Sequence, residues 1–295
     1  MTDPLGRPDR TERLDLVVPG ATAEIDLRHG GRVASLRLDG IELLVTRGSS
    51  DLDWGAYPMA PWAGRLDQGR FTFRGRTHRL PLSLPPHAIH GTVWNRPWAS
   101  VDQAPSQATL ESDLGPDWPF PGLARQRIAL DPDGLTLDLS IEAEHEPMPA
   151  ILGWHPWFAR GQAVRDEPAG TVPVEIDLRA GAMLLRGPDG LPTGQLVEPP
   201  PPPWDDAFVH LSAPPLVRWA GVAEVEVRAT VRGLAPTDEA VPAPVWVVYT
   251  EHSSGVCVEP QSGPPNGFNS GQFAIVEPGR PLVLSIRLTW QRLAG

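Results

Sequence analysis

Two short segments far apart in the chain each place one proton-transfer group among apolar residues and prolines. Residues 154–158 read Trp-His-Pro-Trp-Phe and carry the imidazole of His155. Residues 257–261 read Cys-Val-Glu-Pro-Gln and carry the carboxylate of Glu259. An imidazole and a carboxylate that face each other across a small polar substrate are the groups that acid–base chemistry at one carbon needs. We therefore expect His155 and Glu259 to be the catalytic residues.

Strand alternation predicts the neighbours of His155. It places Gly153 and Trp157 on the face of the imidazole, so that the glycine leaves space and the indole is a flat apolar neighbour. Pro156 cannot donate to a sheet ladder, so we expect it at an edge strand or a strand end. The alternative interpretation of His155 is a half-buried structural histidine.

The same alternation groups Cys257 and Gln261 with Glu259. A buried carboxylate without a partner is costly, so Glu259 either pairs with an arginine as a structural ion pair or faces a polar cavity. In the second case Gln261 is a further candidate to contact the substrate. The turn-rich loop at residues 262–269 is expected to wall that cavity.

Other polar residues are candidates to bind the substrate. His90 precedes Gly91, which permits a close approach of backbone or ligand. Arg65 lies in a constrained Gly-Arg segment, and Asp205 and Asp206 follow a proline run. Each of these residues taken alone has an alternative as a solvated loop charge.

The chain contains eleven tryptophans. Flat aromatic faces suit the apolar C–H faces of sugar rings, while polar side chains bind the hydroxyls. Trp62 and Trp157 are the two candidates for such stacking, and the other tryptophans are expected in the core or at its rim.

Composition excludes several functional classes. The chain has 295 residues and a net charge of −11, which disfavours nucleic acid and anionic membranes as partners. It has no lysine, so pyridoxal phosphate enzymes, Schiff-base aldolases and Walker-type phosphate loops are excluded. Its single cysteine, Cys257, cannot form an internal disulfide or a thiolate zinc site. With no signal-like or membrane-length apolar stretch, we expect a soluble cytoplasmic protein without a metal site.

Short alternating runs between frequent prolines and glycines indicate an all-β fold, a large antiparallel β-sandwich. The turn sequence at residues 131–134 predicts a hairpin. We expect residues 1–12 to be loosely ordered and residues 13–295 to form one domain. The clearest runs are residues 22–27, 32–38, 125–130, 134–143, 223–230 and 282–290.

Together these segments resemble the aldose 1-epimerase (galactose mutarotase-like) family. The resemblance runs in order along nearly the whole chain, and its most specific parts are the histidine-proline-aromatic-phenylalanine and glutamate-proline-glutamine motifs. The matching segments are residues 30–36, 61–66, 87–91, 117–120, 153–158, 204–208 and 256–269. The resemblance implies a β-supersandwich that interconverts the anomers of a free aldose without a cofactor.

The resemblance also implies individual roles. His155 would protonate the ring oxygen as the C1–O5 bond breaks, and Glu259 would take the proton from the C1 hydroxyl. His90 would form a hydrogen bond near the ring oxygen, while Arg65 and Asp205 would hold sugar hydroxyls. Asp206 replaces Asp205 in this role if the loop register differs by one.

Departures from the family pattern leave the sugar preference open. They are His87 in place of asparagine, Trp157 in place of tyrosine and Thr92 in place of a second glycine. Two alternatives stay open. The first is a hexose-6-phosphate epimerase, which is disfavoured because Trp94 stands where an arginine is expected, although Arg96 is nearby. The second is a non-catalytic carbohydrate-binding module. The sequence does not indicate the oligomeric state.

Overall fold

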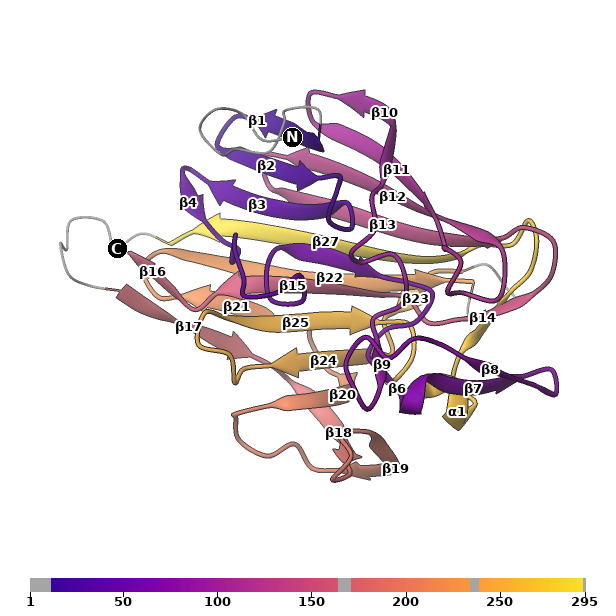
Figure 1. Cartoon of the computed structure of the whole chain (residues 1–295). Coiled ribbons are helices and arrows are strands. Elements are labelled where there is room, and N and C mark those ends of the chain that lie inside the picture. The colour runs from indigo at the N-terminus through magenta and orange to yellow at the C-terminus, as the bar shows by residue number, and fades with distance from the viewer. Residues whose placement is uncertain (1–11, 164–170, 234–238, 294–295) are drawn as a thin grey trace.

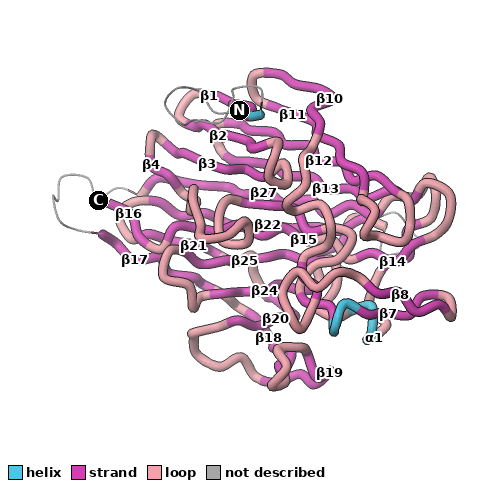
Figure 2. The backbone as a smooth tube through the Cα atoms, in the orientation of Figure 1, coloured by secondary structure: helices cyan, strands magenta, loops and turns pink. Residues whose placement is uncertain are grey.

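The computed structural model describes residues 12–163, 171–233 and 239–293. Strands make up most of this backbone, and helix is confined to short segments such as α1 (Gly267–Ser270) and a 3-10 turn (Asp67–Gly69) (Figure 2). The predicted all-β fold is confirmed. None of the described helices is long and apolar enough to cross a membrane. The expected loose segment 1–12 lies, except for residue 12, outside the described residues.

Two large antiparallel sheets form the body of the described chain, and Figure 1 shows the first in front of the second. The first sheet contains, in spatial order, β1 (Arg13–Val18), β2 (Ala21–Asp26), β3 (Arg32–Leu38), β5 (Ala56–Met59), β15 (Gly153–Ala159), β25 (Gly255–Gln261), β24 (Val245–Tyr249), β20 (Asp205–Leu211), β18 (Ala180–Arg186) and β19 (Pro192–Val197), with β4 (Ile41–Glu42) beside β3. The second contains β10 (Ala99–Ala104), β11 (Gln107–Asp113), β12 (Gly122–Asp131), β13 (Gly134–Ala143), β27 (Leu282–Arg292), β22 (Ala223–Arg232), β21 (Leu216–Trp219), β17 (Thr171–Asp177) and β16 (Gly161–Ala163), with β23 (Val241–Pro242) beside β22.

Three strand pairs stand apart from these sheets. They are β6 (Arg65–Leu66) with β9 (Ala88–Ile89), β7 (Arg70–Phe73) with β8 (Arg76–Arg79), and β14 (Met148–Ala150) with β26 (Ala274–Val276). Figure 1 draws β6 and β9 in front of the first sheet, beside β24 and β25.

The predicted strands and hairpin are confirmed by alternating burial. In β13, Leu135, Leu137, Leu139 and Ile141 are fully buried while the residues between them are partly exposed. β12 turns into β13 through the predicted hairpin, with Asp131 paired to Gly134. Apolar side chains of both sheets merge in one hydrophobic cluster. That residues 13–295 form one domain stays a prediction.

The pairing of β15 with β25 positions the two catalytic candidates. Gly153 pairs with Gln261 and Trp157 with Cys257, a register that sets His155 opposite Glu259. The prediction of an edge or strand end at Pro156 was wrong, because β15 lies between β5 and β25 inside the sheet. Its ladder to β25 is instead interrupted between these two residue pairs, so a proline without an N–H is tolerated there.

Candidate active site

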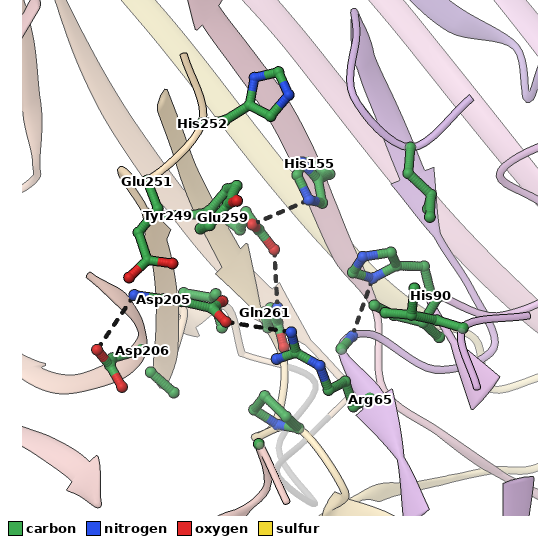
Figure 3. Close-up of a pocket in the computed structure, with 18 of the residues that line it drawn as sticks. Arg65, His90, His155, Asp205, Asp206, Tyr249, Glu251, His252, Glu259 and Gln261 are labelled. Atoms are coloured by element: carbon green, nitrogen blue, oxygen red, sulfur yellow. Dashed lines mark hydrogen bonds and ion pairs between the residues drawn. The ribbon is translucent and has the colours of Figure 1, made fainter. Parts of the chain in front are cut away.

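His155 and Glu259 meet at the base of a cavity of about 410 Å³ (Figure 3). The Nε2 atom of His155 lies 3.2 Å from Oε1 of Glu259, and the two residues are only 6% and 2% exposed. No arginine lies within ion-pair distance of Glu259 among the described residues. The sequence left open a structural ion pair with an arginine or a polar cavity. The structure decides for the second, because Glu259 faces a cavity and a histidine.

Two aromatic rings hold the His155 imidazole between them. Tyr57, opposite His155 on β5, stacks on it at 4.6 Å between ring centroids and 24° between planes. Trp157 stacks at 5.4 Å and 20°. Gly153 does not leave open space beside the imidazole as expected: the space at this position is filled by other side chains, because a Cβ there would lie 2.5 Å from the Met59 methyl carbon and 2.8 Å from Ala63.

Burial shifts the two pKa values of the pair in opposite directions. Desolvation lowers the pKa of His155 well below its ordinary value of 6.5, and the nearby His90 and Arg32 lower it further. Desolvation raises the pKa of Glu259 well above its ordinary value of 4.5, and the charge of Asp205 adds to this rise. Opposed shifts in neighbouring titratable groups are typical of acid–base sites, because each group is brought toward neutrality.

His90 lies beside the pair in a strained backbone conformation. Its φ is +62°, and a Cβ on the following Gly91 would lie 1.9 Å from the Ala60 carbonyl oxygen, so only glycine fits there. Burial lowers the pKa of His90 to about 3, so the ring is neutral. Its Nδ1 accepts the Gly64 N–H at 3.3 Å, which leaves the proton on Nε2 as a donor.

Arg65 and Asp205 meet across the cavity, because Arg65 is the first residue of β6 and Asp205 is the first residue of β20. Arg65 donates to Asp205 at 3.2 Å (Figure 3). Arg186, at the end of β18, contacts Asp205 at 2.8 Å and Asp206 at 3.2 Å. Both aspartates line the cavity, so the structure keeps both as candidates.

The remaining sequence candidates divide between cavity and core. Gln261 lines the cavity and donates to Glu259 at 3.4 Å, while its own Oε1 is buried without a partner in the described part of the chain. Pro265 shows that the 262–269 loop contributes to the wall. Trp62 is buried against Trp118 and is not a lining residue, so it cannot be a stacking platform. His87 is also buried outside the lining, where it contacts the Asp189 carbonyl.

Several lining residues were missed by the sequence reasoning. They are Tyr57, Arg186, Tyr249, Glu251, Asp53 and His252. His252 lies at the cavity, where its ring packs against Trp157 at 5.1 Å. The only sequence signal for Tyr57 is that the chain has just two tyrosines; the others resemble ordinary loop or strand residues until the strands assemble.

One group of described residues has the composition of a metal site. One nitrogen, sulfur and oxygen atom of His155, Cys257 and Glu259 lie within 4.8 Å of one another. Burial raises the pKa of the Cys257 thiol well above its usual range, and Nε2 of His155 already faces the Glu259 carboxylate. A metal ion needs deprotonated ligands, so this arrangement suits proton transfer better than a resident cation.

Comparison with known proteins places this geometry in a family. The sequence profile of aldose 1-epimerase matches residues 19–289. Two Escherichia coli proteins described as uncharacterized, YihR and YphB, are each 24% identical, over 89% and 81% of this chain and 88% and 85% of their own lengths. A putative aldose 1-epimerase from E. coli K12 has the same fold, with a TM-score of 0.78 and 20% identity over 95% of this chain and 99% of its own. Galactose 1-epimerase from Lactobacillus acidophilus is also similar, with a TM-score of 0.72 and 16% identity over 97% of both chains. The chain thus belongs to the aldose 1-epimerase family.

Proposed function

We propose that this protein interconverts the α and β anomers of a free aldose by general acid–base catalysis. The observation that supports this most directly is the buried His155–Glu259 pair, 3.2 Å apart at the base of a polar cavity. The cavity also offers the neutral donor of His90 and the hydroxyl-binding groups of Arg65 and Asp205.

In this mechanism the pair moves one proton in each direction. Glu259 takes the proton of the C1 hydroxyl while protonated His155 gives its proton to the ring oxygen, and the C1–O5 bond breaks. The open aldehyde rotates about C1–C2. In ring closure, the C5 hydroxyl gives its proton to His155 and attacks the other face of the aldehyde. At the same time Glu259 returns a proton to the carbonyl oxygen. Such transfers typically contribute about 10²–10⁴-fold each.

Each half of the cycle uses a different arrangement of the same proton. Ring opening starts from imidazolium and carboxylate and ends with neutral imidazole and carboxylic acid, so the pair carries one proton throughout. The opposed pKa shifts of the two residues stabilise the neutral arrangement, the one that meets the open aldehyde. Closely coupled groups such as these titrate as a pair.

The charges of the cavity favour an uncharged sugar over a phosphorylated one. Both lining guanidinium groups, Arg65 and Arg186, already contact Asp205. Three further carboxylates, those of Asp53, Asp206 and Glu251, line the same space. An added phosphate would therefore meet net negative charge.

The two positions singled out for the hexose-6-phosphate alternative do not line the cavity. Trp94 is buried beside Tyr57, and Arg96 pairs with Asp113. Neither position supplies a phosphate contact in this arrangement, so the argument against a phosphorylated substrate comes from the lining carboxylates.

The test is anomer exchange in Glu259→Gln and His155→Gln. Glu259→Gln keeps the shape of the side chain and loses its basicity, and His155→Gln keeps a polar side chain and loses the titratable ring, so we expect turnover to fall by about 10²-fold or more, as for loss of general acid–base catalysis. Sugar binding should stay within a few-fold. Turnover near that of the wild type in either variant would show that the roles are wrong.

Polarimetry on freshly dissolved α-glucose and α-galactose separates this proposal from a carbohydrate-binding module. An enzyme shortens the approach to the equilibrium rotation in proportion to its concentration. A binding module binds the sugar and leaves the spontaneous rate unchanged.

A further inference from the structure

One backbone carbonyl, that of Leu52, accepts hydrogen bonds from both rings that enclose His155. The Tyr57 hydroxyl donates to it at 3.0 Å, and the Trp157 indole N–H donates to it at 2.7 Å. Tyr57 comes from β5 and Trp157 from β15, while Leu52 belongs to the loop before β5. The two walls of the imidazole slot are therefore fastened at a single point.

The loop that carries this carbonyl is itself held rigidly. The fully buried guanidinium of Arg32 donates to the carbonyls on either side of Leu52, those of Asp51 at 2.8 Å and Trp54 at 2.9 Å. It also lies 4.2 Å from the Trp54 ring centroid. Asp53 accepts the backbone N–H groups of Ser49 and Ser50 at 2.8 and 2.7 Å. Fixed neighbours on both sides leave the Leu52 carbonyl little freedom to move.

Stacked planes continue this arrangement into the site. The Arg32 guanidinium lies 5.0 Å from the Tyr57 centroid, and the ring of Tyr57 stacks on His155. Burial raises the pKa of the Tyr57 phenol well above its usual value of 10, so the hydroxyl keeps the proton that it donates to Leu52. Tyr57 is fully buried and Trp157 is 4% exposed, so most of the surface of both rings is in contact with protein.

We propose that Tyr57, together with the indole N–H of Trp157, acts as a positioning clamp that fixes the His155 imidazole toward Glu259 through the Leu52 carbonyl. Among the described residues, no other residue forms a hydrogen bond with the buried Nδ1 atom of His155, so the ring is not oriented by a partner on that side. Histidines that transfer protons are commonly oriented by a hydrogen bond at the second nitrogen. Here the orientation comes from the two stacked rings.

The proposal rests on the proposed function, because it assigns a purpose to the orientation of a proton-transferring histidine. The test compares Tyr57→Phe, which keeps the ring and loses the hydroxyl, with Tyr57→Leu, which loses the ring. Trp157→Phe removes the indole donor and keeps a flat ring for any sugar contact. The double variant Tyr57→Phe/Trp157→Phe removes both donors to Leu52 and keeps both aromatic faces.

We expect kcat to fall by about 2–10-fold in each phenylalanine variant, the range of one neutral hydrogen bond. In the double variant kcat should fall by more than the product of the single effects, because one ring that is still bonded to Leu52 can hold the imidazole by itself. Tyr57→Leu should lose more than Tyr57→Phe, since stacking is lost as well. KM should stay within about twofold of wild type in the phenylalanine variants, because hydroxyl-binding residues are unchanged.

The matched control is Trp290→Phe. Its indole N–H also donates to a carbonyl, that of Pro132 at 3.1 Å, but it lies on β27 of the second sheet and does not line the cavity. It removes the same kind of bond and should leave kcat unchanged. A similar loss of kcat in this control would overturn the clamp.

A second readout does not depend on turnover. The ¹⁵N and ¹H ring resonances of His155, assigned by their absence in His155→Gln, should shift or broaden in the double variant and in Tyr57→Leu, and stay unchanged in Trp290→Phe. Unchanged resonances together with unchanged kcat would refute the proposal, and so would a rise in KM at constant kcat. If the wild type has no anomer-exchange activity but the resonances respond as expected, the proposed function fails while the clamp stands.

Discussion

In the proposed mechanism His155 and Glu259 share one proton, so the pH profile should report the pair and not either residue alone. Because desolvation lowers the pKa of His155, the pair takes up a second proton, on the imidazole, only below the ordinary imidazole value of 6.5. Because desolvation raises the pKa of Glu259, the last proton is lost only well above 4.5. We expect a bell-shaped profile whose acid limb comes mainly from the imidazole and whose alkaline limb comes mainly from the carboxyl group.

Anomer exchange measured between pH 4 and pH 10 tests this expectation, with correction for the spontaneous rate at each pH. In Glu259→Gln and His155→Gln the residual activity should retain one limb at most. A residual activity that kept the full bell would show that the two limbs belong to other groups.

The raised pKa of Glu259 also predicts an effect on stability. A folded-state pKa above the unfolded value stabilises the fold at low pH, and this contribution is lost as pH rises through the folded pKa. Glu259→Gln should therefore be more stable than wild type at neutral and alkaline pH, with the gain growing as pH rises. A gain of about 1 kcal/mol corresponds to about 2–4 °C in Tm for chains of 150–250 residues.

Thermal unfolding at pH 5 and pH 8.5 measures this difference. The comparison variant is Glu226→Gln, whose carboxylate is paired with Arg228 on an exposed part of β22. A Tm of Glu259→Gln below that of wild type at pH 8.5 would contradict the assignment of a desolvated carboxyl group.

Strand β20 carries two adjacent aspartates that line the cavity, and the two differ in their contacts with arginines of neighbouring strands. Asp205 contacts both Arg65 of β6 and Arg186 of β18, whereas Asp206 contacts only Arg186 among these cations. The charge of Asp205 contributes to the raised pKa of Glu259. We expect Asp205→Asn to raise KM by about tenfold, the range of a charge-assisted hydrogen bond, and Asp206→Asn by less.

Isothermal titration with galactose and steady-state anomer exchange would separate the two aspartates. Arg186→Ala should resemble Asp205→Asn in part, because it releases both carboxylates from β18. Arg228→Ala, which breaks an exposed pair on the second sheet, is its control. A larger effect of Asp206→Asn would assign the sugar contact to Asp206.

Across the whole cavity, carboxylates outnumber guanidinium groups, and this predicts selection against anionic sugars. Asp53, Asp205, Asp206 and Glu251 oppose an added phosphate, and Glu259 would join them when ionised. We expect kcat/KM for glucose 6-phosphate to be at least about tenfold lower than for glucose at low salt. The difference in kcat/KM between the two sugars should become smaller as salt screens the repulsion, and Glu251→Gln should reduce this difference further.

The measurement is anomer exchange by NMR on both sugars at matched concentrations in 20 mM and 300 mM NaCl. A wild type that prefers the phosphorylated sugar would move the protein to the hexose-phosphate class and overturn the substrate proposal.

The sequence predicted the fold and its strands because both depend on short-range patterns. Alternation in residues 32–38 and 134–143 matched β3 and β13, and the turn at residues 131–134 joined β12 to β13. The same alternation put Gly153, His155 and Trp157 on one face of their strand, and Glu259 and Gln261 on one face of theirs. It failed at Pro156, because a proline signals a missing donor but not whether the neighbouring strand interrupts its ladder there.

What the amino-acid sequence determined by itself was therefore the class of fold and the family, and it also singled out His155 and Glu259 as the candidate acid–base pair. Only the tertiary structure decided which groups surround that pair. Leu52 and Tyr57 are close to each other in the chain but far from His155 and Glu259, and Arg186 comes from a third region, so no local pattern records that these residues surround the pair. Burial likewise appears only when the sheets pack, and it is burial that moves the pKa values of His155 and Glu259 in opposite directions.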